Sequence, residues 1–283
     1  MRNKKKEDKK LIDQTIHEQK RAQWIKEARI IDNAFMHAFF DGNKEAAELV
    51  LQIILNRKDF KVDDIQVEKH LKNLHGHDTK FDVHAQDDNG NRFDVEVQRD
   101  SSGANRRRAR YHSAMLDSHM LKENQKYDEL KDSYVIFITE NDVLNQGDPL
   151  YKIERIILNN DEHFNDGGHI IYVNGAFKDD STELGRLMHD FTCANPDEMY
   201  YQEIAKKVRY LKRDNGGIKE MTEYYDKWER EIAEEAAEEA ITNKSLEIAM
   251  NLIAKGKLSY EDIADATGLS IEKVTELARA KAV

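Results

Sequence analysis

Acidic and amide side chains alternate with apolar ones between residues 80 and 98. The first half of this segment carries Asp82, and the second half, beyond a glycine turn, carries Glu96 and Gln98. Successive side chains of a β-strand point to opposite faces, so these three polar residues are expected on one face of a hairpin. Carboxylate oxygens are the ligands that Mg²⁺ prefers, and bound Mg²⁺ supports hydrolysis of phosphate esters. The opposite face is expected to hold Phe81, Val83, Ala85, Phe93, Val95 and Val97.

The turn between the two halves predicts which residues face each other. Asp88-Asn89-Gly90 fits a three-residue loop with glycine in the left-handed position. Asp87 then pairs with Asn91, which places Asp82 opposite Glu96. A two-residue Asn-Gly turn would instead pair apolar positions with polar ones, which a half-buried sheet rejects. The same register places Lys80 opposite Gln98 and His84 opposite Asp94.

Two opposed carboxylates repel each other unless a cation lies between them. Their Cβ atoms would be roughly 5 Å apart on adjacent strands. A divalent ion such as Mg²⁺ relieves the repulsion and keeps waters for a substrate phosphate, and the Val97 carbonyl could supply a further ligand. The alternative is an exposed hairpin whose acidic residues only make one face polar and solvated. The arginine-rich segment that follows Gln98 favours a metal site, but the spacing of the residues alone leaves both alternatives open.

The overall charge argues against a protein that coats nucleic acid. The formal net charge is -11, whereas proteins that bind phosphate backbones are usually basic or have a basic face. Contact with DNA must therefore use local positive segments. One is the Lys-rich N-terminus. The other contains Arg106, Arg107, Arg108 and Arg110, which cover more than one face of a helix and are expected to contact phosphates.

Strands and helices alternate up to about residue 195. This order predicts an α/β fold with a mixed sheet flanked by helices, followed by an all-helical C-terminal extension. The strands are expected at 65–67, at two sites within 80–98, and at 134–138, 153–158 and 170–173. Helices are expected from Asp32, after Asn43, and over 105–124 and 182–191. Asn195, with Pro196 at the first helical position, is expected to begin the helical extension.

The chain is expected to contain four segments: a charged helix or arm (1–30), a core (31–195), a helical extension (196–255) and a small helix-turn-helix-like hairpin (256–283). The stretch Glu229–Glu239 is dominated by Glu and Ala, which favours a solvated helix that links or oligomerises. In the hairpin, Ser259 and Ser270 are good N-caps and Gly268 permits a turn. Its last helix is acidic, which favours a structural or protein-binding role over contact with DNA.

The hairpin motif resembles the signature of the PD-(D/E)XK nucleases. Asp82, the glycine turn and Glu96-Val97-Gln98 are most similar to the transposase, or recombination-promoting nuclease, branch, where Gln commonly replaces the motif lysine. The resemblance extends over about residues 32 to 255. It includes Asp32-Asn33-Ala34-Phe35, Phe39-Phe40, Arg110-Tyr111-His112 and the 134–138 strand. Position 36 departs from it, with Met where relatives often carry Lys.

This resemblance implies a restriction-endonuclease-like core over 31–195 that hydrolyses DNA phosphodiesters. Asp82 and Glu96 would bind Mg²⁺, and Gln98 would position or polarise the attacking water. Gln98 lacks the charge of the motif lysine, and we infer that Lys80, across the hairpin, supplies it. Two alternatives remain: a degenerate relative that binds DNA without cleaving it, and an oligomeric interaction protein that uses its acidic C-terminal helix.

Other features predict location and partners. Cys193 is the only cysteine, so an internal disulfide is excluded and a reducing cytoplasm is expected. No apolar run approaches 18 residues, so no membrane span is expected. DNA is the expected partner, together with a homo-oligomer through the C-terminal helices. A zinc site is disfavoured because no cysteine or helical i, i+4 spacing accompanies the four histidines His70, His75, His77 and His84.

Overall fold

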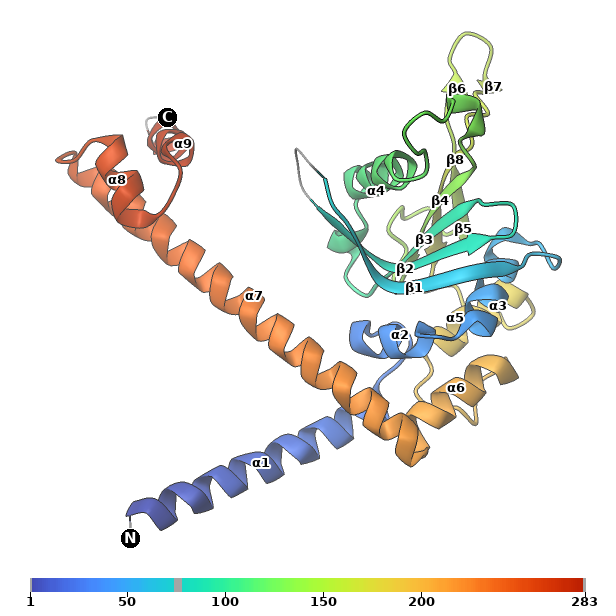
Figure 1. Ribbon diagram of the computed structural model, residues 1–283, viewed down its shortest axis with the longest axis horizontal. Coiled ribbons are helices and arrows are strands. Elements are labelled where there is room, and N and C mark those ends of the chain that lie inside the picture. The colour runs from blue at the N-terminus through green and yellow to red at the C-terminus, as the bar shows by residue number, and fades with distance from the viewer. Residues whose placement is uncertain (1, 74–77, 282–283) are drawn as a thin grey trace. The chain divides into compact units, whose positions relative to one another are not determined.

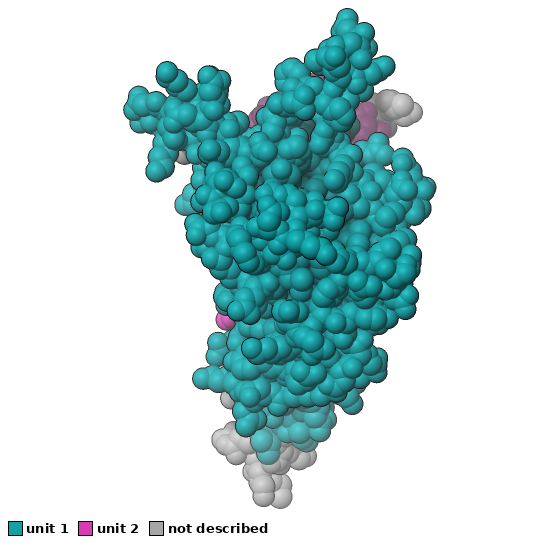
Figure 2. Space-filling view, turned by 90° about the vertical axis from the view of Figure 1, so that its right-hand side faces the viewer, with its two compact units in different colours: residues 1–225 teal, residues 226–283 magenta. Residues whose placement is uncertain are grey.

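A six-stranded mixed sheet forms the centre of the first of two units in a computed structural model (Figure 1). The structure describes residues 2–73 and 78–281. Its two units comprise residues 1–225 and 226–283, distinguished by colour in Figure 2. The predicted α/β fold with a mixed sheet and a helical C-terminal region is confirmed. None of the described helices is both long and apolar enough to cross a membrane.

The order of strands in the sheet is β1-β2-β3-β4-β8-β5. The bounds are β1 (Val62–Leu71), β2 (Thr79–Asp87), β3 (Arg92–Gln98), β4 (Ser133–Thr139), β5 (Leu150–Ile153) and β8 (Gly168–Asn174). β1, β2 and β3 are antiparallel, whereas β3, β4 and β8 run parallel. Val135–Ile138 on β4 is fully buried, because helices cover both faces of this parallel part.

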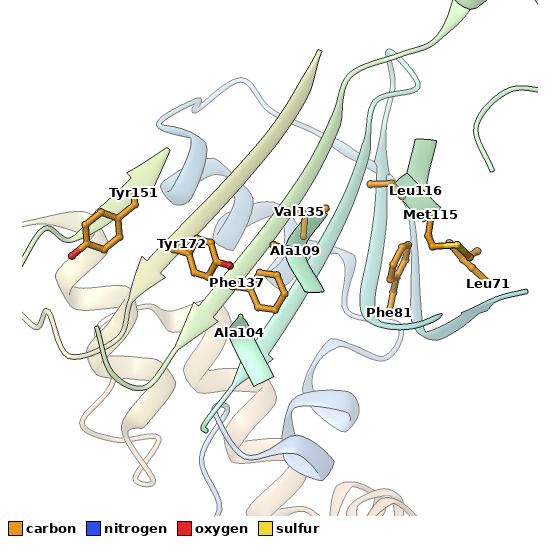
Figure 3. Packing of buried hydrophobic residues seen from close by; sticks show 10 residues of the cluster. All are labelled: Leu71, Phe81, Ala104, Ala109, Met115, Leu116, Val135, Phe137, Tyr151 and Tyr172. Atoms are coloured by element: carbon orange, nitrogen blue, oxygen red, sulfur yellow. The ribbon is translucent and has the colours of Figure 1, made fainter. Parts of the chain in front are cut away.

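The helices of this unit are α1 (Arg2–Glu27), α2 (Asn33–Phe40), α3 (Lys44–Leu55), α4 (Arg106–Ser118), α5 (Glu183–Thr192) and α6 (Gln202–Arg213), with short turns η1 (Ser101–Ala104) and η2 (Tyr127–Glu129). Figure 1 shows α4 on one face of the sheet and α2, α3 and α5 on the other. Under α4, Phe137 of β4 and Tyr172 of β8 stack at 5.4 Å, and Phe81 packs with Met115 and Leu116 (Figure 3). This packing fixes α4 beside the predicted polar residues of β3.

Three sequence-based expectations about elements are wrong. The helix expected at Asn195 begins only at Gln202, because Asn195 instead closes a turn by accepting a hydrogen bond from the Glu198 amide (3.1 Å). The helix expected over 105–124 ends at Ser118. The strand expected over 153–158 is split between β5 and a separate exposed hairpin of β6 (Ile156–Ile157) and β7 (Glu162–His163).

The second unit contains most of α7 (Asn215–Lys255), then α8 (Tyr260–Thr267) and α9 (Ile271–Lys281). Ser259 and Asp262 form a capping box at α8, and Gly268 ends that helix with a φ of 69°. These features confirm the predicted cap and turn. A small core holds the hairpin against the end of α7, and it consists of Ala249, Ile263, Ala264 and Val274.

Candidate active site

The β2–β3 hairpin has the predicted turn and register. Gly90 has a φ of 84°, and the Asp87 amide donates to the Asn91 carbonyl at 3.1 Å. His84 faces Asp94, as the three-residue loop requires. The Asp87 carboxylate fixes the loop by accepting from the amides of Asn89 and Asn91. The turn therefore sets which polar residues of the two strands can meet.

The predicted alternation of faces is wrong at Phe81, which was expected on the face of Val83 and Ala85. Phe81 packs under α4, 5.2 Å from the His112 ring, and it also lies 6.2 Å from the His84 ring on the same side. Side chains three residues apart share a face only where a strand is irregular. Glu68, on the adjacent β1 between the partners of Phe81 and Val83, has a left-handed φ of 54°. The two strands are therefore irregular side by side at the position of Asp82.

Asp82 and Glu96 converge where β2 separates from β3. The Asp82 amide donates to Glu96 Oε1 at 3.1 Å, and the Val97 amide donates to Asp82 Oδ2 at 3.1 Å. The Gln98 side-chain nitrogen donates to both carboxylates, at 3.3 Å to Asp82 and 3.4 Å to Glu96. Side chains thus replace the backbone pairing that a regular hairpin would continue here. One amide group lies within hydrogen-bond distance of both acids.

Helix α4 adds two side chains to this group. Arg108 Nη2 donates to Glu96 Oε2 at 2.6 Å, and Arg108 Nε donates to His112 Nε2 at 3.3 Å. His112 Nδ1 lies 2.7 Å from Asp94 Oδ2 and 3.7 Å from Glu96 Oε1. Arg108 and His112 are one helical turn apart, so both point to the strand that carries Asp94 and Glu96. Asn105 is the N-cap of α4, and its side chain accepts hydrogen bonds from the amides of residues 107 and 108. This cap fixes where the helix begins and therefore which of its side chains face β3.

Burial dominates the electrostatics of the site. Asp94 and Glu96 are fully buried, and burial raises the pKa of each well above its ordinary value; the charge of Asp82 raises both further. Burial also lowers the pKa of His112, partly offset by Glu96. These directions favour neutral forms of Asp94 and His112 in the metal-free protein. Two or more buried acids in contact are unfavourable without a compensating cation.

These residues fit a divalent metal ion. One ligand atom from each of Asp94, Glu96 and His112 lies within 4.8 Å of the others, and all three residues are buried. Asp94 Oδ1 is buried and has no hydrogen-bond partner among the residues that the structure describes. A buried polar atom without a partner is rare in proteins and suits a ligand position. The donor set of carboxylates with one imidazole is typical of ions that activate water.

The remaining predicted site residues are Lys80 and the four arginines. Lys80 was expected opposite Gln98, but the pairing of β2 with β3 ends at Val83 and Val95, and the Lys80 ammonium instead lies 2.5 Å from Glu68 Oε1 of β1. Arg108 turns inward onto Glu96, whereas Arg106, Arg107 and Arg110 are exposed and make no ion pair within the described part of the chain. The zinc hypothesis, already disfavoured, rested on four histidines. Of these, His75 and His77 lie outside the described residues, and His70 is exposed while His84 is buried.

Sequence reasoning missed three residues of this site. Asp94 and His112 complete the acidic group, and His37 of α2 is buried with its Nε2 3.7 Å from Asp82 Oδ1. The alternation Asp94-x-Glu96-x-Gln98 already placed Asp94 on the polar face. The i, i+4 spacing of Arg108 and His112 could have indicated a shared helical face. No sequence signal pointed to His37.

An acidic site on two strands of a mixed sheet, with a helix packed beside it, defines a restriction-endonuclease-like α/β protein. Residues 29–183 match the family of PD-(D/E)XK nuclease family transposases. The chain belongs to this family, as its hairpin motif predicted. No curated protein and no solved structure matches the chain. PD-(D/E)XK nucleases depend on divalent metal ions, in agreement with the acidic group found here.

Proposed function

We propose that the protein is a Mg²⁺-dependent DNA endonuclease. The observation that carries this proposal is the convergence of Asp82 and Glu96 on the Gln98 amide, beside the buried, unpartnered oxygen of Asp94. Membership of a nuclease family supports phosphodiester hydrolysis as the reaction. DNA as the substrate follows from the same membership and not from the overall charge.

Asp82 and Glu96 would hold the ion, with the Val97 carbonyl as a further ligand. Asp94 and His112 lie close enough to Glu96 to contribute to the same set. The bound ion would lower the pKa of a water molecule and stabilise negative charge on the phosphate in the transition state. Because the acids are buried, these interactions act in a low-dielectric site, where they are stronger than in water.

Gln98 would orient the attacking water through its side-chain amide. Its nitrogen already lies between the two carboxylates, so it is placed to hold a molecule bound there. An amide can hold water but cannot supply a proton or a charge. Arg108 supplies a positive charge in contact with Glu96, and Lys80 stays our proposal for a second positive charge near the site. Arg106, Arg107 and Arg110 would contact DNA phosphates.

Plasmid cleavage tests the proposal directly. Supercoiled plasmid incubated with the full chain and Mg²⁺ is expected to become nicked or linear, and EDTA should prevent this. Asp82→Asn keeps the size of the side chain but removes a ligand charge, so this variant should be inactive. Parallel reactions with Mn²⁺ and Ca²⁺ identify the ion. Equal cleavage by the wild type and Asp82→Asn, or none by either with any of these ions, would contradict the proposal.

Gly103→Ala is expected to lower cleavage by about tenfold or more without unfolding the protein, on the scale of a lost positioning contact. A Cβ at Gly103 would lie 2.3 Å from Gln98 Oε1. This atom ends a flexible side chain, so the amide of Gln98 moves and the backbone does not. Initial rates of plasmid nicking and a thermal melt measure the two effects.

Gln98→Ala provides the matched background for this test. If Gly103 acts through Gln98, adding Gly103→Ala to Gln98→Ala should change the rate little, since the displaced group is already absent. Rate losses that simply multiply in the double variant would show that Gly103 acts by another route.

A further inference from the structure

Three nitrogen-bearing side chains, Lys69, His84 and Arg92, gather on strands β1, β2 and β3 next to the acidic site. We call them the basic cluster. His84 faces Asp94 across the β2–β3 hairpin, and Arg92 lies two residues before Asp94 on β3. Arg92 Nη1 donates to the His119 carbonyl at 3.0 Å, just beyond the C-terminal end of α4. Lys69 of β1 pairs with Phe81, which packs under α4, so the whole basic cluster lies on the α4 side of the sheet, as the acids do.

Two cations of the basic cluster are half-buried without an acidic partner. Neither Lys69 nor Arg92 makes an ion pair within the described residues, although Asp64 acts on Lys69 through space. Burial and the charge of Arg92 lower the pKa of Lys69. Burial of unpaired like charges is unfavourable, and a bound anion would offset it.

His84 adds a buried group with an unsatisfied nitrogen. It is 3% exposed, and its Nδ1 has no hydrogen-bond partner within residues 2–73 and 78–281. An imidazole N–H can donate a hydrogen bond to an anionic oxygen. The basic cluster thus offers two cations and one unsatisfied buried nitrogen.

We infer that Lys69, His84 and Arg92 bind a backbone phosphate of the DNA at a short distance from the phosphodiester to be cleaved. This inference rests on the proposed function. Arg92 is four residues from Glu96 on β3, or about 13 Å along a strand. At about 3.4 Å of rise per charge in one DNA strand, a few nucleotides cover this distance. A contact of this kind fixes the register of the DNA without reading its sequence.

DNA binding without metal tests the basic cluster separately from catalysis. We propose anisotropy titrations of a fluorescein-labelled duplex in EDTA over a series of NaCl concentrations. Lys69→Met should weaken binding about tenfold at low salt, the scale of one charge-assisted hydrogen bond. It should also reduce the slope of log K against log[salt] by about 0.9, the value for one phosphate contact. Arg92→Gln should act in the same direction, and Lys69→Arg should keep wild-type affinity.

Lys61→Met is the matched control. Lys61 is an exposed lysine whose ammonium lies 2.7 Å from Glu48, so it is already paired. Its loss should leave the salt slope unchanged. Thermal melts separate binding from folding. Lys69 donates no hydrogen bond within the described residues, so Lys69→Met should melt at or above the wild-type temperature, whereas Arg92→Gln also loses the His119 contact.

The outcomes distinguish this inference from the proposed function. Unchanged affinity and slope in both Lys69→Met and Arg92→Gln, with cleavage by the wild type intact, overturn the basic cluster alone. A wild type that neither binds nor cleaves DNA overturns both. Inorganic phosphate that binds the wild type but not Lys69→Met, together with unchanged DNA affinity, would assign the cluster to a free anion and also overturn the inference.

Discussion

A Glu96→Gln protein is expected to lose Mg²⁺-dependent cleavage by about a thousandfold, yet to be more stable than the wild type in EDTA. Loss of a ligand removes several kcal/mol of the charge stabilisation that a bound ion supplies, which corresponds to about three powers of ten in rate. The neutral amide meanwhile replaces a fully buried acid that lies beside Asp82 and Asp94. Stability and activity should therefore change in opposite directions.

The pH dependence of the metal-free protein follows from the same burial. The pKa of Glu96 is raised in the folded state, so the folded protein keeps a proton that the unfolded chain releases above about pH 4.3. The contribution of Glu96 to stability is then fully present below that pH and is lost as the pH rises through the folded pKa. Glu96→Gln should remove the share of this fall in stability that comes from Glu96. The share that comes from Asp94 should remain.

Urea unfolding in EDTA between pH 4 and 8 measures the decline, and thermal melts with added Mg²⁺ measure ion binding. Mg²⁺ should raise the melting temperature of the wild type but not that of Glu96→Gln. Glu48→Gln is a suitable control, because Glu48 pairs with Lys61 outside the site. A Glu96→Gln protein that retains both its cleavage and its stabilisation by Mg²⁺ would show that Glu96 does not hold the ion.

Much of the hairpin could be predicted from sequence because its determinants are local. A left-handed glycine at Gly90 selects the loop, and the loop length selects the register, so the pairs Val83–Val95 and His84–Asp94 followed from nearby residues. The buried run 135–138 likewise predicted a central strand, because a parallel strand covered on both faces needs apolar residues throughout.

The predictions that were wrong or were not made concern contacts between residues that are distant in sequence. The irregularity at Asp82 coincides with the left-handed backbone of Glu68, and a glutamate gives no signal of that conformation. His37 of α2 lies 45 positions before Asp82 in the sequence. The two residues meet because α2 packs against the sheet, and no hydrophobic periodicity in the sequence predicts that contact. Arg108 was predicted as a DNA contact because four arginines lie together, but only tertiary structure shows which one turns inward.

Removal of Arg108 is expected to destabilise the metal-free protein by about 3 kcal/mol at pH 8, the lower end of the scale for a buried charge that loses its partner. Its guanidinium contacts Glu96, which is fully buried, at 2.6 Å. In Arg108→Met this acid has no cation beside it, and the fold must either protonate Glu96 or weaken. A divalent ion supplies the missing charge, so saturating Mg²⁺ should restore most of the loss.

Urea unfolding in EDTA and in Mg²⁺ measures both effects, and two further variants locate them. Arg110→Met removes an exposed arginine of the same helix that makes no ion pair among the described residues, and it should change stability little. In a Glu96→Gln background, Arg108→Met should cost much less stability than in the wild type. The acid that needed the cation is gone, and only the hydrogen bonds of Arg108 to His112 and to the Gly103 carbonyl are lost. If Arg108→Met is as stable as the wild type in EDTA at pH 8, Arg108 does not compensate a buried charge on Glu96. A divalent ion would then not be needed to compensate that charge either.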